Sequence, residues 1–254
     1  MASAGNRFDT KVALVTGAGS GMGRAIAVRL AAEGAQVFGH DINANGLTET
    51  EQMVTDAGGR MLVRDGDISE RAECVEMVAD CVSAYGRIDV VGNVAGVARA
   101  EHFVDVSEDA YRWMMGVNVD GPFFVAQAVI PHLLETGGNL VNIASNAGLM
   151  GQAYTVVYCM SKGAVVQMTR SLAMEYVKTS IRVNAIAPAG INTTLTTNFA
   201  IPSDVDFELM APYTGYRGMG EAEDIAALFA FLASDEASNI HGSIISSDRG
   251  VTAG

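Results

Sequence analysis

Short apolar runs alternate with longer amphipathic stretches from one end of the chain to the other. The apolar runs are rich in Val, Ile and Ala and are bounded by turn residues, which is typical of buried strands. Seven strands are predicted in this way, at Val12–Thr16, Gln36–His40, Met61–Arg64, Asp89–Val94, Leu140–Ala144, Arg182–Ala187 and Ser243–Ser247. Strands that alternate with helices predict a doubly wound parallel sheet of about seven strands, an α/β fold with helices on both faces.

The stretch after the third strand shows the helical pattern most clearly. Apolar residues recur there at spacings of three and four, and Ser69 is placed to cap the start of the helix. The repeating positions are Cys74, Val78, Cys81, Val82 and Tyr85. A seven-residue spacing between two cysteines on one helix indicates a core face rather than a metal pair.

The 254 residues contain no linker, repeat or low-complexity tract, so we expect residues 1–254 to form a single domain. One irregular stretch runs from Pro188 to about Arg217, and a connection of that length is usually functional or mobile.

The uncharged run Thr136–Ser161 holds too many polar residues for a membrane span. The first eleven residues lack the apolar core of a secretion signal, which favours a cytoplasmic protein.

The charge and the metal-binding residues exclude several classes of protein. The chain has 29 acidic against 16 basic residues, a net charge of -13, so neither nucleic acid nor an anionic membrane is an expected partner. Three cysteines without a C-x-x-C pair predict a reduced protein with buried thiols. The four histidines are scattered, and we expect no metal.

A glycine-rich string separates the first strand from the first helix. Its sequence, Thr16 to Gly23, has the T-G-x-x-x-G-x-G spacing, and this position is where a Rossmann-type fold binds the pyrophosphate of a dinucleotide. The alternative is a structural turn. The residues expected to contact the cofactor here are Gly17, Gly19, Ser20, Gly21, Met22 and Gly23.

The residues that end the next strands extend the predicted dinucleotide site. Asp41 ends the second strand, where a carboxylate accepts hydrogen bonds from the adenosine ribose and repels a 2′-phosphate; this predicts NAD(H) in preference to NADP(H). A capping role before Asn43 is the alternative. Asp67 and Ile68 follow the third strand and are placed near the adenine, although Asp67 is equally a turn residue. The small residues after the fourth strand are expected under the adenosine: Asn93, Ala95 and Gly96.

Four further residues complete a pattern. Asn118 and Ser145 precede a Tyr158-x-x-x-Lys162 pair, with Ser145 thirteen residues before Tyr158. With the glycine string and the N-x-A-G at Asn93–Gly96, these motifs cover essentially the whole chain. In this order and spacing, the chain resembles the single-domain short-chain dehydrogenases/reductases. The resemblance implies an NAD-dependent oxidoreductase acting on CH–OH groups.

The chemistry of the pair supports the same interpretation. Tyr158 and Lys162 are four residues apart on a helix, so they share a face. We expect the lysine ammonium and an oxidised nicotinamide to lower the pKa of Tyr158 from its usual value of about 10, so that it exchanges a proton with the substrate oxygen. Ser145 is expected to stabilise the same oxygen. The alternative for Tyr158 is a core aromatic.

The resemblance also implies roles that the residues alone do not show. Lys162 is implied to bind the nicotinamide ribose, and Asn118 to hold a water that links Lys162 to solvent. Pro188, Ile191 and Thr193 are implied to lie at the nicotinamide. Residues 193–217 are implied to form a lid over the substrate, and the assembly is implied to be a homotetramer.

Three positions depart from the family pattern. Val94 stands where a second asparagine is usual, Ala189 follows Pro188 where glycine is usual, and Arg249 replaces the first glycine of a terminal D-G-G. The first two are expected to shift cofactor affinity without removing the chemistry. The sequence offers no role for Arg249.

Six residues near the predicted catalytic pair, all but Gln152 largely apolar, suggest the substrate. Three lie on the lid (Leu195, Phe199 and Met210) and three precede the catalytic helix (Met150, Gln152 and Tyr154). They favour a hydrophobic or alicyclic alcohol or ketone, and residues 147–151 resemble hydroxysteroid dehydrogenases. A small helix packed on the sheet explains the lid residues equally well. A 3-oxoacyl-thioester reductase and a sugar or polyol dehydrogenase remain alternatives. A non-catalytic NAD sensor is a distant one.

Overall fold

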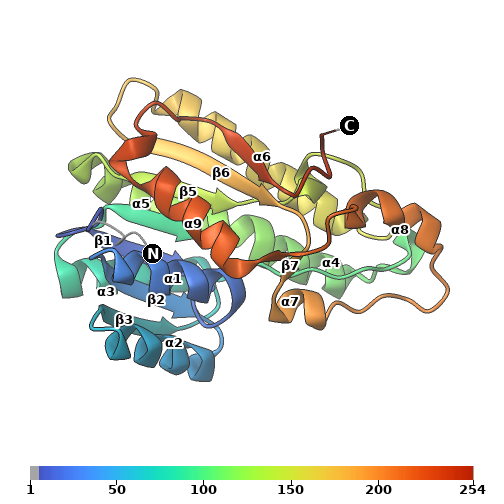
Figure 1. Cartoon of the computed structure of the whole chain (residues 1–254), viewed down its shortest axis with the longest axis horizontal. Coiled ribbons are helices and arrows are strands. Elements are labelled where there is room, and N and C mark those ends of the chain that lie inside the picture. The colour runs from blue at the N-terminus through green and yellow to red at the C-terminus, as the bar shows by residue number, and fades with distance from the viewer. Residues whose placement is uncertain (1–5, 254) are drawn as a thin grey trace.

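The computed structural model describes residues 6–253 and shows a parallel sheet with helices on both sides (Figure 1). The strand order is β3-β2-β1-β4-β5-β6-β9, and all of these strands are parallel. The strands are β1 Val12–Thr16, β2 Gln36–Asp41, β3 Arg60–Asp65, β4 Val90–Asn93, β5 Asn139–Ile143, β6 Arg182–Pro188 and β9 Ile244–Ser247. The predicted doubly wound α/β fold is confirmed. All seven strands lie where the sequence predicts them, with ends that differ by one residue at most.

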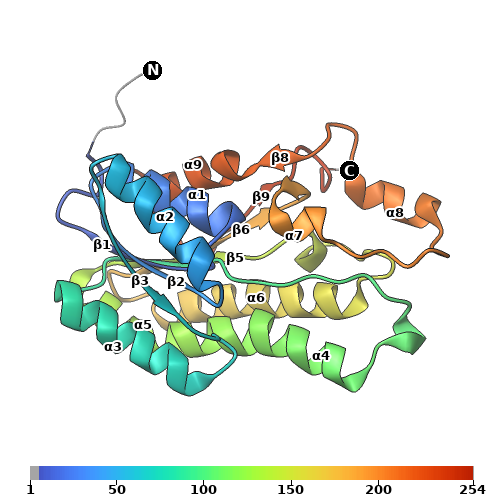
Figure 2. The same ribbon diagram turned by 90° about the horizontal axis from the view of Figure 1, so that it is seen from below.

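Figure 2 shows the two helical layers that cover the sheet. One face carries α1 (Gly21–Ala32), α2 (Ala44–Asp56) and α9 (Ala222–Ala233). The other carries α3 (Arg71–Tyr85), α5 (Gly121–Thr136) and α6 (Val156–Glu175). Because the central strands are buried on both faces, their apolar runs are continuous rather than alternating.

The third helix differs from the sequence prediction at its start. It begins at Arg71 and its N-cap position is Glu70, so the predicted cap at Ser69 is wrong. The backbone N–H of Ser69 instead donates to the Asp67 carboxylate at 2.9 Å, which places Ser69 in a turn before the helix. The predicted core face is confirmed, because Cys74 and Cys81 are buried free thiols. Burial raises the pKa of Cys81 to about 12.

The chain between β4 and β5 forms one long helical element in three parts. Helix α4 (Glu108–Met115) runs through a π-helical turn (Gly116–Asp120) into α5. Ser107 caps the start of α4 by accepting the Ala110 N–H at 3.1 Å. The π turn holds Asn118, and such turns are frequent at functional sites because they re-aim side chains.

The stretch 188–217 contains two short helices, where the sequence offered one small helix as an alternative, and a short strand that it did not predict. Strand β7 (Ile191–Asn192) pairs with β8 (Gly220–Glu221), and the helices α7 (Thr194–Thr197) and α8 (Phe207–Thr214) lie between them. Figure 1 places α7 and α8 beyond the end of the sheet and not against a sheet face. Within residues 6–253, no helix has the length and apolar character needed to cross a membrane.

Candidate active site

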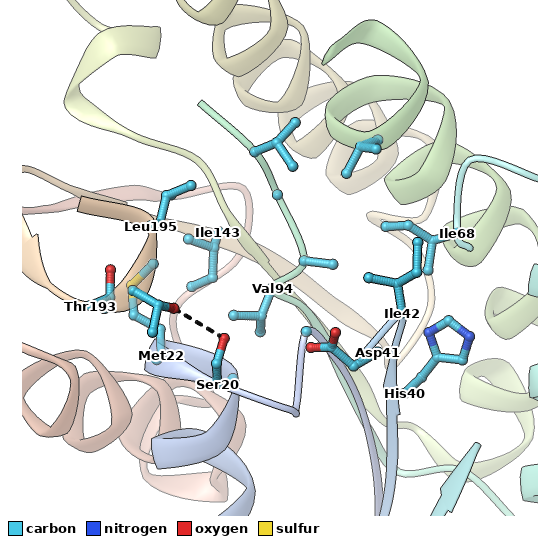
Figure 3. A pocket seen from close by; sticks show the side chains of 18 of the residues that line it. Ser20, Met22, His40, Asp41, Ile42, Ile68, Val94, Ile143, Thr193 and Leu195 are labelled. Atoms are coloured by element: carbon cyan, nitrogen blue, oxygen red, sulfur yellow. Dashed lines mark hydrogen bonds between the residues drawn. The ribbon is translucent and has the colours of Figure 1, made fainter. Parts of the chain in front are cut away.

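A cavity of about 370 Å³ opens at the carboxyl ends of the strands, where the strand order reverses between β1 and β4 (Figure 3). Ligands bind at this position in doubly wound sheets. Fourteen of the sequence-predicted residues line it: Gly17, Ser20, Gly21, Met22, Gly23, Asp41, Asp67, Ile68, Ala95, Gly96, Tyr158, Lys162, Thr193 and Leu195. The predicted cofactor end and the predicted catalytic pair therefore share one cavity.

The glycine loop is shaped by close backbone contacts. Gly17 has φ +70°, and a Cβ at this position would lie 2.9 Å from the backbone of Ala95 on the neighbouring strand segment. A Cβ on Gly23 would lie 1.9 Å from the carbonyl oxygen of Gly17. Both positions therefore require glycine, and the loop brings the N-terminal end of α1 to the cavity, where its free N–H groups favour an anion.

Asp41 is held rigidly at the other side of this loop. One carboxylate oxygen accepts the Gly19 N–H at 2.9 Å, and the other accepts the Asn43 N–H at 2.9 Å. The N-cap of α2 is Asn43, whose side chain accepts the Gly46 N–H, so the alternative capping role for Asp41 is wrong. In Figure 3 the Asp41 carboxylate lies beside the glycine loop at the edge of the cavity. Its position fits a ribose.

Lys162 lies at the opposite end of the cavity and is almost fully buried. Its ammonium donates to the carbonyl oxygen of Ile143, the last residue of β5, at 2.9 Å. Burial lowers the pKa of Lys162 to about 8. The ammonium also lies 5.9 Å from the ring centroid of Tyr158, one helical turn earlier on α6. The predicted shared face of the pair is therefore present.

The expected effect on Tyr158 is opposite in direction in this structure. Desolvation raises the pKa of Tyr158, and a hydrogen bond with Ser145 offsets only part of that rise. Desolvation therefore dominates in the protein alone, and Lys162 does not lower the pKa of Tyr158 there. The expected lowering with an oxidised nicotinamide bound stays a prediction. Ser145 itself is fixed by the Ala147 N–H at 3.1 Å and donates to Asn146 at 3.2 Å.

Asn118 connects α6 to the loop after β4. Its side chain accepts the Val97 N–H and donates to the Val97 carbonyl, both at 2.8 Å, and it donates to Ser161 at 3.0 Å. Gly96 lies between this amide and Lys162, since a Cβ there would be 3.3 Å from each. Asn118 and Ser145 are buried behind the cavity and do not line it.

Four predicted cofactor residues are outside the lining of the cavity: Gly19, Asn93, Pro188 and Ile191. Asn93 is buried and donates to the carbonyl of Pro122 and to Asn142, so it joins β4 to α5 and β5. Ile191 is packed in the core with α9. Two of the four contact residues that line the cavity: the Gly19 N–H donates to Asp41, and the Ile191 carbonyl accepts from the Thr193 hydroxyl.

Only some of the predicted substrate residues line the cavity. Leu195 lines the cavity, but Met150, Gln152, Tyr154, Phe199 and Met210 do not. Gln152 donates to Asn146 at 3.0 Å, next to Ser145. The hydroxyl of Tyr154 accepts the backbone N–H of Asp206 at 2.9 Å. Met210 is buried on α8, in the stretch predicted to form the lid.

Several lining residues were missed by sequence reasoning. The aromatic and aliphatic wall is formed by Val97, Trp113 and Val117 from the β4–α5 region, and His40 and Ile42 flank Asp41. Trp113 is the only tryptophan of the chain. No motif marks these positions, and only their closeness to motif residues offers a signal.

The comparisons with known proteins agree with this geometry. A family model described as enoyl-(acyl carrier protein) reductase matches residues 17–252. A meso-2,3-butanediol dehydrogenase of Serratia marcescens is 38% identical over 97% of this chain and 96% of its own. The chain belongs to the short-chain dehydrogenase/reductase family. It is therefore an oxidoreductase of that family.

Two further relatives show how widely the fold and sequence are shared. A 2,5-dichloro-2,5-cyclohexadiene-1,4-diol dehydrogenase of Sphingobium indicum is 36% identical over 98% of this chain and 99% of its own. A short-chain dehydrogenase of Mycobacterium paratuberculosis, solved bound to NAD, superposes with a TM-score of 0.90 at 32% identity, covering 98% of this chain and 100% of that one.

Proposed function

We propose that the protein transfers a hydride between NAD(H) and a secondary alcohol or ketone, with a hydrophobic or alicyclic substrate. The observation that carries this proposal is the single cavity that joins Asp41 and the glycine loop at one end to Tyr158 and Lys162 at the other. The NAD-bound mycobacterial relative supports the choice of cofactor. The diol dehydrogenases among the relatives support alcohol oxidation.

The residues at the catalytic end would act on the proton. When bound, the nicotinamide ring accepts or donates the hydride and, in its oxidised form, brings a positive charge. Tyr158 takes the proton of the alcohol hydroxyl during oxidation and returns it to the carbonyl oxygen during reduction. Ser145 donates to the same oxygen. Lys162, held by Ile143, lies close enough to favour the phenolate of Tyr158 once the site is filled.

The adenosine end supports a preference for NAD(H) over NADP(H). Burial lowers the pKa of His40, so the imidazole beside Asp41 is neutral despite its contact with Glu73. The nearby Arg24 is already engaged by Glu49 at 2.7 Å and by the Gly19 carbonyl at 2.6 Å. A 2′-phosphate would therefore meet the Asp41 carboxylate without an available cation.

Asp41→Ala tests the preference. We expect wild-type protein to favour NAD over NADP in kcat/KM, and the variant to reduce that ratio by about 10- to 100-fold because like-charge contact costs several kcal/mol. Asp41→Asn is the matched control for shape, because it keeps a hydrogen-bond acceptor in the side chain and removes the negative charge. Equal efficiency of wild-type protein with both cofactors would exclude this role for Asp41.

A panel of secondary alcohols and ketones, followed by NADH absorbance, tests the reaction and the substrate class. Two apolar side chains line the cavity outside the adenosine end: Ile143, whose carbonyl oxygen holds Lys162, and Leu195. They favour cyclohexanol and larger alicyclic alcohols over polyols. The matched family model, described as an enoyl-(acyl carrier protein) reductase, keeps 3-oxoacyl thioesters in the panel as the second candidate. Turnover of none of these would favour a non-catalytic NAD-binding protein.

We further propose that residues 1–254 act as one domain with residues 193–217 as its lid, in a cytoplasmic homotetramer without nucleic acid or membrane partners. Exposed apolar residues on the α4–α5 and α6 surfaces, such as Phe123, Val156 and Met160, support association of subunits. Light scattering coupled to gel filtration measures the number of subunits.

A further inference from the structure

Among residues 6–253, three residues other than glycine have a positive φ in the left-handed region. They are Thr10 (64°), Tyr154 (64°) and Arg249 (54°). A bulky side chain rarely adopts this conformation, because its Cβ crowds the backbone, and such strain persists where the surrounding structure requires it. Thr10 lies in an exposed turn before β1, far along the chain from the lid. Tyr154 and Arg249 both contact the lid.

Tyr154 contacts the lid just before α8. Its hydroxyl accepts the backbone N–H of Asp206, the N-cap residue of α8, at 2.9 Å. Its own carbonyl accepts the Glu101 N–H at 2.8 Å, and its ring meets the ring of His102 edge to face at 5.2 Å. His102 in turn lies 3.0 Å from the Asp204 carboxylate. One side chain therefore joins the loop after β4, the segment before α6 and the lid.

Arg249 contacts the lid after α8. Its guanidinium donates to the backbone carbonyl of Arg217 at 3.0 Å, three residues beyond the end of α8. It also lies 3.6 Å from the carboxylate of Asp224 in the first turn of α9. Asp248, the preceding residue, stabilises the turn that contains Arg249. Its carboxylate accepts the N–H groups of Gly250 and Thr252, both at 2.9 Å.

We propose that Tyr154 and Arg249 are positioning residues that hold the two ends of α8, and so fix the substrate lid over the catalytic end of the cavity. Both contacts go to backbone atoms of the lid, so they are independent of which side chains the lid carries. Glycine would relieve the strain at either position but would remove the contact. Arg249 stands where the family pattern has glycine, and the contact with Arg217 gives that departure a function.

The proposal rests on the proposed function for the role of residues 193–217 as a substrate lid. Its first test does not depend on that role. Arg217 is the only lysine or arginine between Arg182 and Arg249, so trypsin cleavage after Arg217 reports on this end of the lid. The carbonyl of that peptide bond is the one that Arg249 binds. In Arg249→Gly we expect cleavage after Arg217 to become about fivefold faster, the effect of losing one hydrogen bond. The melting temperature should stay the same or rise, because the strain is relieved.

Thr10→Gly is the matched control, since it relieves the same kind of backbone strain away from the lid. Its melting temperature should also hold or rise, with no change in cleavage after Arg217. Tyr154→Phe keeps the ring and removes the hydroxyl, so chymotrypsin cleavage at Phe207 should become faster by a similar factor.

Steady-state kinetics extend the test to function. With a secondary alcohol from the panel, both lid variants should raise the KM for the alcohol several-fold and change kcat less. NADH affinity, followed by Trp113 fluorescence, should be unchanged. Cleavage after Arg217 at the same rate in Arg249→Gly and Thr10→Gly would overturn the proposal, as would unchanged cleavage at Phe207 in Tyr154→Phe. Failure of wild-type protein to bind NADH would instead contradict the proposed function and leave the cleavage result standing.

Discussion

The polar groups beneath the catalytic end of the cavity and the residues of the lid are held in opposite ways. The first group, which we call the Tyr158 floor, consists of Ser145, Tyr158 and Lys162. Ser145 and Lys162 are 7% and 4% exposed, and each is fixed by a backbone group of β5 or of the turn that follows it. In the lid, Phe207 and Leu209 are 66% and 54% exposed. The lid is held by contacts to its backbone, by the His102–Asp204 pair and by the buried side chains of Val205 and Met210.

The difference matches two requirements of the proposed reaction, namely proton transfer and the entry and release of substrate. A proton transfer needs its groups fixed to within fractions of an ångström, which the sheet and α6 provide for the floor. A substrate must enter and leave, which requires a cover held by contacts that are individually weak. Under the proposed function, the reaction would take place on the rigid sheet, and residues 193–217 would select the substrate as a more loosely held lid.

The largest effect expected is on the floor. Tyr158→Phe removes the hydroxyl that would exchange the proton, and we expect kcat to fall by about 10²- to 10⁴-fold. NADH should still quench Trp113, because the ring of Tyr158 remains. Tyr85→Phe is the control: it removes a hydroxyl that donates to the Val37 carbonyl, away from the cavity. A Tyr158→Phe enzyme within tenfold of the wild-type rate would show that the proton moves elsewhere.

Lys162 should make the stability of the cofactor-free protein depend on pH. Burial lowers its pKa from 10.5 to about 8, so between these values the unfolded chain binds a proton that the folded chain does not. The free energy of unfolding therefore rises with pH across this window, by about 1–2 kcal/mol between pH 8 and 9.5. The slope fades below pH 8 and is absent below about pH 7, where both states carry the proton.

Urea unfolding of wild-type protein and Lys162→Met, compared at pH 7, 8, 9 and 9.5, measures the contribution. The difference between the two should grow in favour of the wild type as the pH rises. Lys178→Met, at an exposed lysine after α6, should show no such growth. The comparison stops below pH 10, because the raised pKa of Tyr158 works in the opposite direction above the ordinary value for tyrosine. If the free energies of unfolding of wild type and Lys162→Met changed in parallel with pH, Lys162 would be solvated in solution.

The sequence predicts those parts of the site that lie close together along the chain. The glycine loop and the Tyr158–Lys162 pair each belong to one local element, so their spacing already gives their geometry. The strands were predictable for a similar reason, since burial on both faces leaves continuous apolar runs.

Contacts between distant segments could not be predicted. The carbonyl that holds Lys162 is 19 residues away, and the pKa of Tyr158 depends on desolvation by the whole fold. Asn93 sits in a family motif, yet packing places it between strands and outside the cavity lining. The contact of Arg249 with Arg217 is likewise a product of tertiary structure.

The smallest effect expected is on the lid, at two neighbouring residues with opposite environments. Leu209 is 54% exposed, whereas Met210 is 6% exposed. Leu209→Ala should change the free energy of unfolding by no more than about 0.5 kcal/mol, as is usual for surface substitutions. Met210→Ala, its matched partner on the same helix, should cost about 2 kcal/mol or more if α8 unfolds together with the sheet. Urea unfolding monitored by far-UV circular dichroism measures both.

The cost of Met210→Ala could instead be as small as that of Leu209→Ala, with faster cleavage after Arg217. That result would show that α8 opens separately from the sheet, and it would sharpen the contrast between lid and floor. A large cost for Leu209→Ala would contradict the contrast, because it would require the lid surface to be covered in solution.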